Sequence, residues 1–340
     1  MGKNITIKDI ARLANVSPTA VSFYLNGKAK NFNLAESTCQ KIQQVIDQYN
    51  YRPNIHARAI NERKTYLVGM LINNLIGSFY AKLVWGVEKE LALHGYHMVF
   101  AATDNNREKE LSALKFMAQT GIDGCIITPH HTDDAFPESY DNSILRGKPI
   151  VNLLYGSAPT PVFDTDHEAG VTAIAREFLQ AGHRKLAYFG QPLPELPGHF
   201  NGERYEVFNR CVLQAGGEPV DVYSQMSEML DHFQEYSGIF CFSDSYAIQM
   251  IIQLQKLKIR VPEDISIAGY GEDDITAFFD FDLTTVRENK EELGRLAAWN
   301  LLQKIEHPEI EIPQRIRMQP LLLPGRTIGP VRSDFLRAGK

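Results

Sequence analysis

From Tyr66 onwards, short apolar runs alternate with longer stretches in which apolar residues recur at helical spacing. The apolar runs predict β-strands at 66–72, 96–101, 124–128, 149–154, 186–189, 239–242 and 265–269. The stretches between and after them predict helices around 79–94, 107–120, 167–181, 203–215, 245–257 and 288–305. Such alternation is typical of α/β folds with helices on both faces of parallel sheets. Because it runs through two halves, 66–165 and 166–290, we expect a body of two lobes.

The start of the chain has a different pattern, in which two short amphipathic stretches meet at a tight break. Thr6 is a predicted N-cap for a helix from Ile7, and the break Asn15-Val16-Ser17 ends that helix. Ser17 is then a predicted cap for a second helix, with Pro18 at its first position, that ends before Asn26-Gly27. Two short helices joined in this way are a helix-turn-helix candidate.

A third helix is expected after the loop 28–33, with Asn33 and Glu36 spaced as a capping box. Its apolar stripe, Ile42, Val45, Ile46 and Tyr49, is typical of a core face and would close a three-helix bundle. A turn over 50–54 and a short piece over 55–60 follow. Because helices shorter than about 12 residues are marginal in water, we expect this piece to be helical only when docked.

Charge is divided unevenly along the 340 residues, whose net charge is -6. Residues 1–64 hold ten basic and four acidic residues, a net +6, whereas residues 65–340 hold 25 basic and 37 acidic residues, a net −12. A basic segment gains affinity for a polyanion by releasing condensed counterions. The whole-chain charge therefore does not exclude nucleic-acid binding by the N-terminal segment.

The segments TIKDIARLANVSPTAVSFYLNG (6–27) and NYRPNIHARAI (50–60) resemble the N-terminus of the LacI/GalR family of bacterial transcription repressors. Body segments at 181–190, 240–247, 261–274 and 283–294 are also similar to family segments, so the resemblance extends to about Thr327. It implies an α/β protein with an N-terminal three-helix helix-turn-helix domain, a hinge helix and a two-lobed body like periplasmic binding proteins. The implied DNA-binding domain is 1–53 and the implied hinge is 54–65. The first lobe would comprise 66–165 plus about 291–320, and the second lobe 166–290 plus about 321–330, followed by a tail at 331–340.

The resemblance also assigns DNA contacts. Pro18, Thr19 and Phe23 occupy positions at which the family reads base edges, and Ser22 and Asn26 occupy positions that contact phosphates. On the hinge helix, which in the family enters the minor groove as a dimer, Ile60 stands where a wedging leucine is usual. The expected DNA-binding residues are Thr6, Ser17, Pro18, Thr19, Ser22, Phe23, Asn26, Asn54, Ala57, Arg58 and Ile60.

Some features depart from the family pattern. The loop 28–33 is longer than in a known member, Ala35 stands where a capping serine is usual, and Ile60 is stiffer at χ1 than leucine. Pro18 and Phe23 cannot donate side-chain hydrogen bonds, so readout would depend on Thr19, on contact of Phe23 with thymine methyl groups, and on DNA shape. A purely structural role of Phe23 and Tyr24 in the bundle core stays an alternative.

A small effector is expected between the lobes, because ligands of open α/β folds bind outside the carboxyl ends of strands. The candidate contacts lie after predicted strands or match family positions: Phe79, Tyr80, Asp104, Arg204, Phe240, Asp244 and Asp273. Phe240 as a core residue and Asp244 as a helix cap stay alternatives. Gly271 and Leu154 stand where the family often has acids, with Glu272 and Asp273 as candidate replacements for the first. A sugar or sugar derivative is the expected effector, and a larger or anionic ligand, or none, stays open.

Other chemistry is not indicated. The cysteines at 39, 125, 211 and 241 form no C-x-x-C pair, His130-His131 is not spaced for a metal, and no phosphate-loop, zinc-protease or serine-hydrolase motif occurs. We therefore expect no enzyme activity, cofactor or metal. No secretory signal or membrane span is evident, so a cytoplasmic, nucleoid-associated protein is expected.

We interpret the chain as a homodimeric transcriptional repressor that binds a two-fold symmetric operator in double-stranded DNA. Residues 329–340 lack heptads, which favours a dimer over a higher oligomer. The alternatives are a regulator of this fold without small-molecule control or with a non-sugar ligand, a solute-binding module without DNA function, and an α/β enzyme with a DNA-binding head.

Overall fold

The computed structural model describes residues 5–25, 27, 29–51, 64–75, 78–129, 144–145, 147–156, 159–190, 200–274, 276, 282–333 and 335. The chain divides into two compact units, Met1–Thr65 and Tyr66–Lys340. The predicted hinge helix, with Asn54, Ala57, Arg58 and Ile60, lies outside the described residues, as do Asn26 and the pair His130-His131.

The N-terminal unit is a small bundle of α1 (Ile7–Ala14), α2 (Pro18–Leu25) and α3 (Glu36–Tyr49). Thr6 forms the predicted cap of α1, within a capping box in which the Asp9 side chain bonds back to the Thr6 backbone. At the second cap, the Ser17 hydroxyl accepts the Ala20 backbone N–H at 3.1 Å. One buried cluster holds the three helices together: Ile10, Ala11, Ala14, Val21, Ile42 and Val45.

The predicted capping box at Asn33 is wrong. Asn33 has a φ of 51°, which is the left-handed region, and Ala35 is the N-cap of α3 without a side-chain cap bond. An N-cap residue normally has extended backbone angles, so Asn33 cannot serve as one here. It instead helps to close a turn in which the Leu34 N–H donates to the Ala29 carbonyl at 2.9 Å.

The first lobe of the body is built on a parallel sheet with the order β11-β5-β4-β3-β1-β2. Its strands are β1 (Leu67–Ile72), β2 (His97–Ala102), β3 (Gly124–Ile127), β4 (Ile150–Leu153), β5 (Val162–Thr165) and β11 (Arg315–Met318). Helices α5 (Ser78–Leu93) and α11 (Lys290–Glu306) pack on one face and α6 (Arg107–Thr120) packs on the other. Because both faces are covered, β1 is apolar along its whole length.

The second lobe has a parallel sheet with the order β7-β6-β8-β9. Its strands are β6 (Leu186–Phe189), β7 (Asp221–Tyr223), β8 (Gly238–Cys241) and β9 (Ser266–Ala268). One face is covered by α7 (His167–Gln180) and α8 (Phe200–Gln214), and the other by α9 (Met226–His232), the short 3-10 helix η2 (Phe233–Glu235) and α10 (Asp244–Lys256). A two-stranded antiparallel ribbon, β10 (Thr285–Arg287) with β12 (Leu321–Leu323), completes it.

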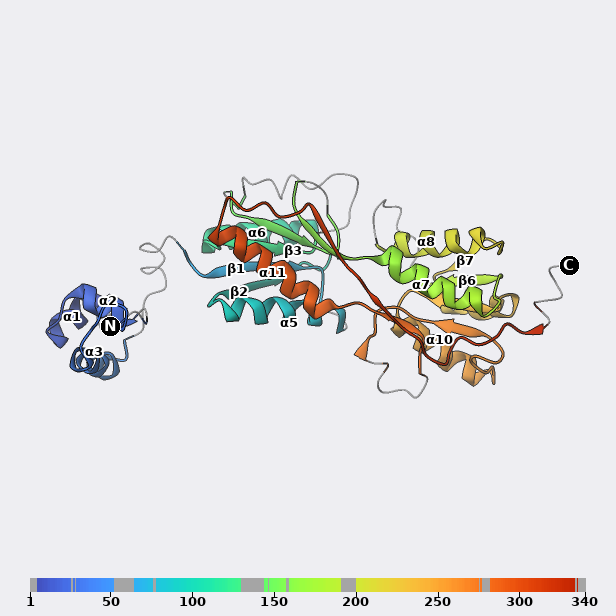
Figure 1. Ribbon diagram of the computed structural model, residues 1–340, viewed down its shortest axis with the longest axis horizontal. Helices are drawn as coiled ribbons and strands as arrows, with labels where there is room; N and C mark the ends of the chain where they lie inside the picture. Colours follow the sequence, from blue (N-terminus) through green and yellow to red (C-terminus); the bar gives the residue numbers. More distant parts are fainter. Residues whose placement is uncertain are drawn as a thin grey trace. The chain divides into compact units, whose positions relative to one another are not determined.

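The chain passes between the two lobes three times, after β5, after β10 and after β11 (Figure 1). As a result α11, which is late in the sequence, packs along α5 of the first lobe (Figure 1). The architecture confirms the predicted α/β fold with a helix-turn-helix unit and a body of parallel sheets. The short strands β5, β7, β10, β11 and β12 were not among the predicted strand ranges.

Candidate functional site

The exposed side of α2 is the candidate DNA-facing surface. Pro18 and Thr19 are exposed and Ser22 is half-buried, whereas Val21 points into the core. Tyr24 packs against that core and its hydroxyl donates to the Gln43 side chain at 2.6 Å. Tyr24 therefore has the purely structural role in the bundle core that the sequence left open.

Phe23 has a different environment from Tyr24. It does not belong to the core cluster, and its ring stacks on that of Phe32 at 3.6 Å between centroids. Pro18, Thr19, Ser22 and Phe23 are spaced so that they share one side of a helix, which is the side left open by the bundle. Phe32 was not among the expected DNA-binding residues.

In the body, Arg204 lies in α8 with its side chain only 3% exposed. Its guanidinium donates to Glu288 Oε1 at 3.2 Å and to the Phe242 carbonyl at 3.0 Å. The guanidinium carbon also lies 3.9 Å from the centre of the Tyr270 ring, a stacking geometry favourable for a cation. Arg204 is thus held rigidly between a carboxylate and an aromatic face.

A second group of buried polar side chains adjoins the Arg204–Glu288 pair, at the place where the chain passes from β5 into α7. His167 Nδ1 lies 3.1 Å from the Tyr270 hydroxyl and 3.8 Å from Glu288 Oε1, and His167 Nε2 lies 3.6 Å from Asp164 Oδ1. Asp164 accepts the Thr165 N–H at 2.7 Å, and Arg315 lies 3.2 Å from its other oxygen. Burial raises the pKa of Asp164 to about 7, although these hydrogen bonds and the Arg315 charge oppose the rise.

Lys290 links the two lobes, because it begins α11 of the first lobe and bonds to the second. Its ammonium donates to the Gly271 carbonyl at 2.7 Å, pairs with Asp273 at 3.2 Å and lies 5.0 Å from the centre of the Phe79 ring. A β-carbon on Gly271 would lie 3.4 Å from this ammonium and 3.6 Å from oxygens of Asp273 and Glu288. An aspartate at 271 would therefore place a third carboxylate beside two existing ones.

Of the two candidate replacements for an acid at 271, Glu272 is bound in an ion pair with Arg287. Asp273 lies within the cluster, where it pairs with Lys290 and accepts the Ser245 hydroxyl at 3.2 Å. Glu288, which pairs with Arg204, is a further carboxylate beside Gly271. We name the set Asp164, His167, Arg204, Tyr270, Asp273, Glu288 and Lys290 the interlobe cluster.

Two expected effector contacts, Phe240 and Asp244, are completely buried. Phe240 is completely buried among Tyr188, Phe208 and Tyr270, so its ring is part of the hydrophobic core. Asp244 is also completely buried, and it caps nothing because α10 begins at Asp244 itself.

The Asp244 carboxylate instead accepts the Thr285 hydroxyl and the Asp273 N–H, which ties β10 and the 271–274 segment to α10. Burial raises its pKa to about 6. Its role is therefore to support the segment that carries Asp273.

The remaining expected contacts belong to the first lobe. Phe79 and Tyr80 are partly buried against its core and meet edge to face, 5.3 Å between centroids. Asp104 is exposed, has a φ of 51° and pairs with Lys109 of α6. Leu154 is buried in the same lobe, also with a left-handed backbone at φ 74°.

Five members of the interlobe cluster were not among the expected effector contacts: Asp164, His167, Tyr270, Glu288 and Lys290. Asp164 and His167 flank the end of β5, a strand that was not predicted, and Glu288 follows β10 directly. The signal that could have found them is the one used for Asp104, a polar residue directly after an apolar run.

Two further properties concern the part of the chain that the structure describes. No group of three or more His, Cys, Asp or Glu side chains there is arranged to hold a metal ion. Over the same residues, no helix combines the length and the apolar character that crossing a membrane needs.

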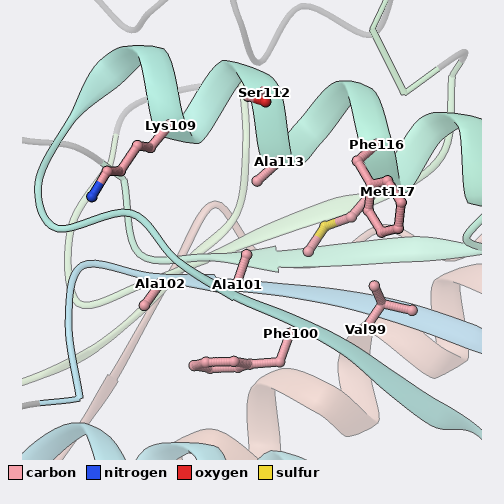
Figure 2. Close-up of a pocket in the computed structure, with 9 residues that line it drawn as sticks. All are labelled: Val99, Phe100, Ala101, Ala102, Lys109, Ser112, Ala113, Phe116 and Met117. Atoms are coloured by element: carbon pink, nitrogen blue, oxygen red, sulfur yellow. The ribbon is translucent and has the colours of Figure 1, made fainter.

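A surface groove of about 530 Å³ lies on the first lobe, between α6 and β2, the edge strand of its sheet. Figure 2 shows Phe116 and Met117 on α6 above Ala101 on the strand, and Phe100 on the opposite side of β2. Phe116 is 60% exposed and Phe100 is 37% exposed. An apolar groove beside an unpaired strand edge is an unusual feature for a surface that stays in water.

Comparison with known proteins agrees with this architecture. Residues 6–54 match a family described as bacterial regulatory proteins, lacI family, and residues 175–328 match a periplasmic binding protein-like domain. Curated relatives include the HTH-type transcriptional repressor PurR of Vibrio vulnificus, 29% identical over 321 residues, with 89% of this chain and 93% of the relative covered. The PurR repressor of Escherichia coli O1:K1 is 29% identical over 350 residues, covering 98% and 99%.

Solved structures share the fold. The lac repressor dimer bound to operator and an anti-inducer superposes with a TM-score of 0.81 at 19% identity, covering 96% of this chain and all of that one. A LacI-family regulator from Enterococcus faecium with bound ribose gives 0.68 at 24% identity, covering 78% and 100%.

Proposed function

This chain belongs to the lacI family of bacterial regulatory proteins, and from that premise we propose that it is a transcriptional repressor whose operator affinity is controlled by a small effector. The observation that carries the proposal is the presence of two separate sites in one chain. One is the exposed side of α2 on a basic N-terminal segment, and the other is the interlobe cluster of the body. A solute-binding module would need only the second.

For DNA binding, α2 would lie in the major groove with Pro18, Thr19 and Phe23 towards base edges and Ser22 towards a phosphate. Thr6 and Ser17 stand at helix N-termini, where a backbone N–H can also meet a phosphate. The hinge residues Asn54, Ala57, Arg58 and Ile60, with Asn26, complete the proposed surface. The acidic body would be repelled by DNA phosphates, so that the head and the hinge approach the duplex.

For the effector, we propose a site at the interlobe cluster, bounded by the aromatic pair Phe79–Tyr80. Arg204, Asp273 and Glu288 are its hydrogen-bonding groups. A ligand there would compete for the pairs that now join the lobes, such as Lys290 with Asp273. Effector binding would thereby change the angle between lobes and the docking of the hinge helices, an order–disorder switch with a coupling of about 1–3 kcal/mol.

The proposed effector is a sugar or sugar derivative, because aromatic faces and charged hydrogen-bonding groups suit its C–H and hydroxyl groups. A non-sugar ligand is the second candidate. It is favoured by Gly271 and Leu154, which leave two hydroxyl acceptors of the family pattern missing.

We also propose that the repressor acts as a homodimer, since a two-fold symmetric operator requires two recognition helices. The groove of Figure 2 is the candidate self-association surface, because a second copy could cover Phe100 and Phe116 and shield the free edge of β2.

The proposed function is tested by selecting DNA sites from a random pool with the full chain and measuring their affinity by gel shift. A two-fold symmetric sequence bound at least about 1000-fold more tightly than random DNA is expected. Sugars, sugar phosphates and nucleobases are then screened by thermal shift and added to the gel shift. No enriched sequence would overturn the repressor assignment, and turnover of a screened compound would favour an enzyme.

A further inference from the structure

The stacked rings of Phe23 and Phe32 join α2 to the loop that precedes α3. Their centroids are 3.6 Å apart and their planes differ by 4°, so the rings lie almost directly on top of each other. Phe32 is nevertheless 52% exposed, which leaves its outer face and edge in solvent. The pair therefore forms an aromatic ledge on the surface of the N-terminal unit.

The loop that carries Phe32 is held in place by its own backbone. The Leu34 N–H donates to the Ala29 carbonyl at 2.9 Å, and the Asn33 N–H donates to the Lys30 carbonyl at 3.1 Å. These bonds close a tight turn around Phe32, with Asn33 in the left-handed conformation. A fixed loop loses little conformational freedom when it binds a partner, which favours a recognition role.

The ledge lies on the open side of α2. Phe23 shares that side with Pro18, Thr19 and Ser22, whereas Val21, Tyr24 and Leu25 face the bundle core. Phe32 likewise belongs to no core cluster among the described residues. The two rings therefore contribute to the surface that would face DNA rather than to the core of the bundle.

We infer that Phe32 is a second base-reading residue and that it acts with Phe23 as one apolar surface for the C5 methyl groups of thymines in the major groove. The inference rests on the proposed DNA-binding function and deepens it. Phe carries no donor or acceptor, and the apolar feature that distinguishes a base in the major groove is the thymine methyl group. Two stacked rings present a wider apolar edge than one and hold each other in register, so adjacent thymines become the preferred bases at this position.

The test uses the full chain and the operator enriched in the site selection. Wild-type protein and the Phe32→Ala variant are each titrated against that operator and against a copy in which deoxyuridine replaces thymine at the half-site positions. Tyr49→Ala, which removes another half-exposed ring from the same unit, is the matched control. Circular dichroism checks that all three proteins are folded.

For wild type and for Tyr49→Ala, removing the methyl groups should weaken binding about fourfold per methyl, the factor that corresponds to burying one such group. For Phe32→Ala the same change should have little effect, and a repeated site selection should lose its thymine preference at those positions. The slope of affinity against salt should be the same in all variants, because no phosphate contact is lost.

An equal methyl dependence in Phe32→Ala and wild type would overturn the inference while leaving the repressor assignment intact, since the operator would still be bound. If Phe32→Ala is unfolded, Phe32→Leu replaces it and should retain part of the methyl dependence. Failure to enrich any operator would count against the proposed function itself and so against the inference that rests on it.

Discussion

Replacing Arg204 by methionine would leave the Glu288 carboxylate buried without the guanidinium that pairs with it. Methionine keeps most of the apolar stem of arginine, so the change removes charge and hydrogen bonds more than volume. Both side chains of the pair are only 3% exposed, which limits how far water can compensate. The contacts with the Phe242 carbonyl and the Tyr270 ring are lost at the same time.

The size of the effect follows from the 3.2 Å separation of the charged atoms. At an effective dielectric constant of about 20, two unit charges at that distance attract by about 5 kcal/mol. Breaking a buried pair by removing one partner typically costs about 3–5 kcal/mol, because the other charge stays desolvated. We therefore expect Arg204→Met to lower the free energy of unfolding of the body by about 3–5 kcal/mol, or to lower its Tm by about 10 °C.

Thermal and urea unfolding followed by circular dichroism measures this loss, and Glu288→Gln with the double variant completes a mutant cycle. The double variant should be more stable than the sum of the two single changes predicts, by at least about 2 kcal/mol. Arg210→Met is the matched control, since Arg210 lies on the same helix but pairs with Glu168 at the surface, and its loss should be below about 1 kcal/mol. Additive single effects, or losses for Arg204→Met no larger than for Arg210→Met, would refute the reasoning.

Three further predictions concern the body. Burial raises the pKa of Asp164 to about 7, so the folded protein binds this proton more tightly than the unfolded chain does. The resulting stability is full below about pH 4 and is lost as pH rises through 7. Asp164→Asn should therefore remove up to about 4 kcal/mol of the pH dependence of the free energy of unfolding, measured by urea melts across this range, and an unchanged pH profile would contradict the shift. Gly86→Ala should destabilise the first lobe by about 1–3 kcal/mol, because the new β-carbon would lie 1.9 Å from the Glu291 carbonyl oxygen. Gly202→Ala, whose new β-carbon would meet no described atom within 4 Å, should be neutral or stabilising in the same melts. Phe116→Asp should shift the full chain towards monomer in analytical ultracentrifugation, because the new charge in the groove would have to be buried in the proposed dimer. An unchanged dimer would exclude the groove between α6 and β2 as the self-association surface.

The sequence predicted the elements well where a single physical signal dominates. The continuous apolar runs of β1 and β3 reflect burial on both faces, and Thr6 with Asp9 is a local capping pattern. Local patterns failed where residues outside the pattern determine the backbone conformation. Asn33 looked like a cap, but the turn around Phe32 gives it a left-handed backbone that a cap cannot have.

The candidate site was less predictable, because its contacts are distant in sequence. Arg204 was identified from the family pattern, but its partner Glu288 lies 84 positions away and is placed by β10, a strand of three residues. Phe240 precedes a strand end, and only the packing of Tyr188, Phe208 and Tyr270 around it shows that it belongs to the core. Such partners are determined by sheet order and by the passages between lobes.

Those three passages have a consequence for synthesis on the ribosome. The first lobe obtains its last strand from residues 315–318, and the second obtains β12 from residues 321–323, so neither lobe can be completed until almost the whole chain has emerged. The bundle of α1, α2 and α3 is complete by Tyr49 and can fold long before them. A nascent chain would therefore hold a finished DNA-reading unit ahead of two unfinished lobes with exposed apolar faces. Their late, nearly simultaneous closure is the stage at which chaperones would matter most.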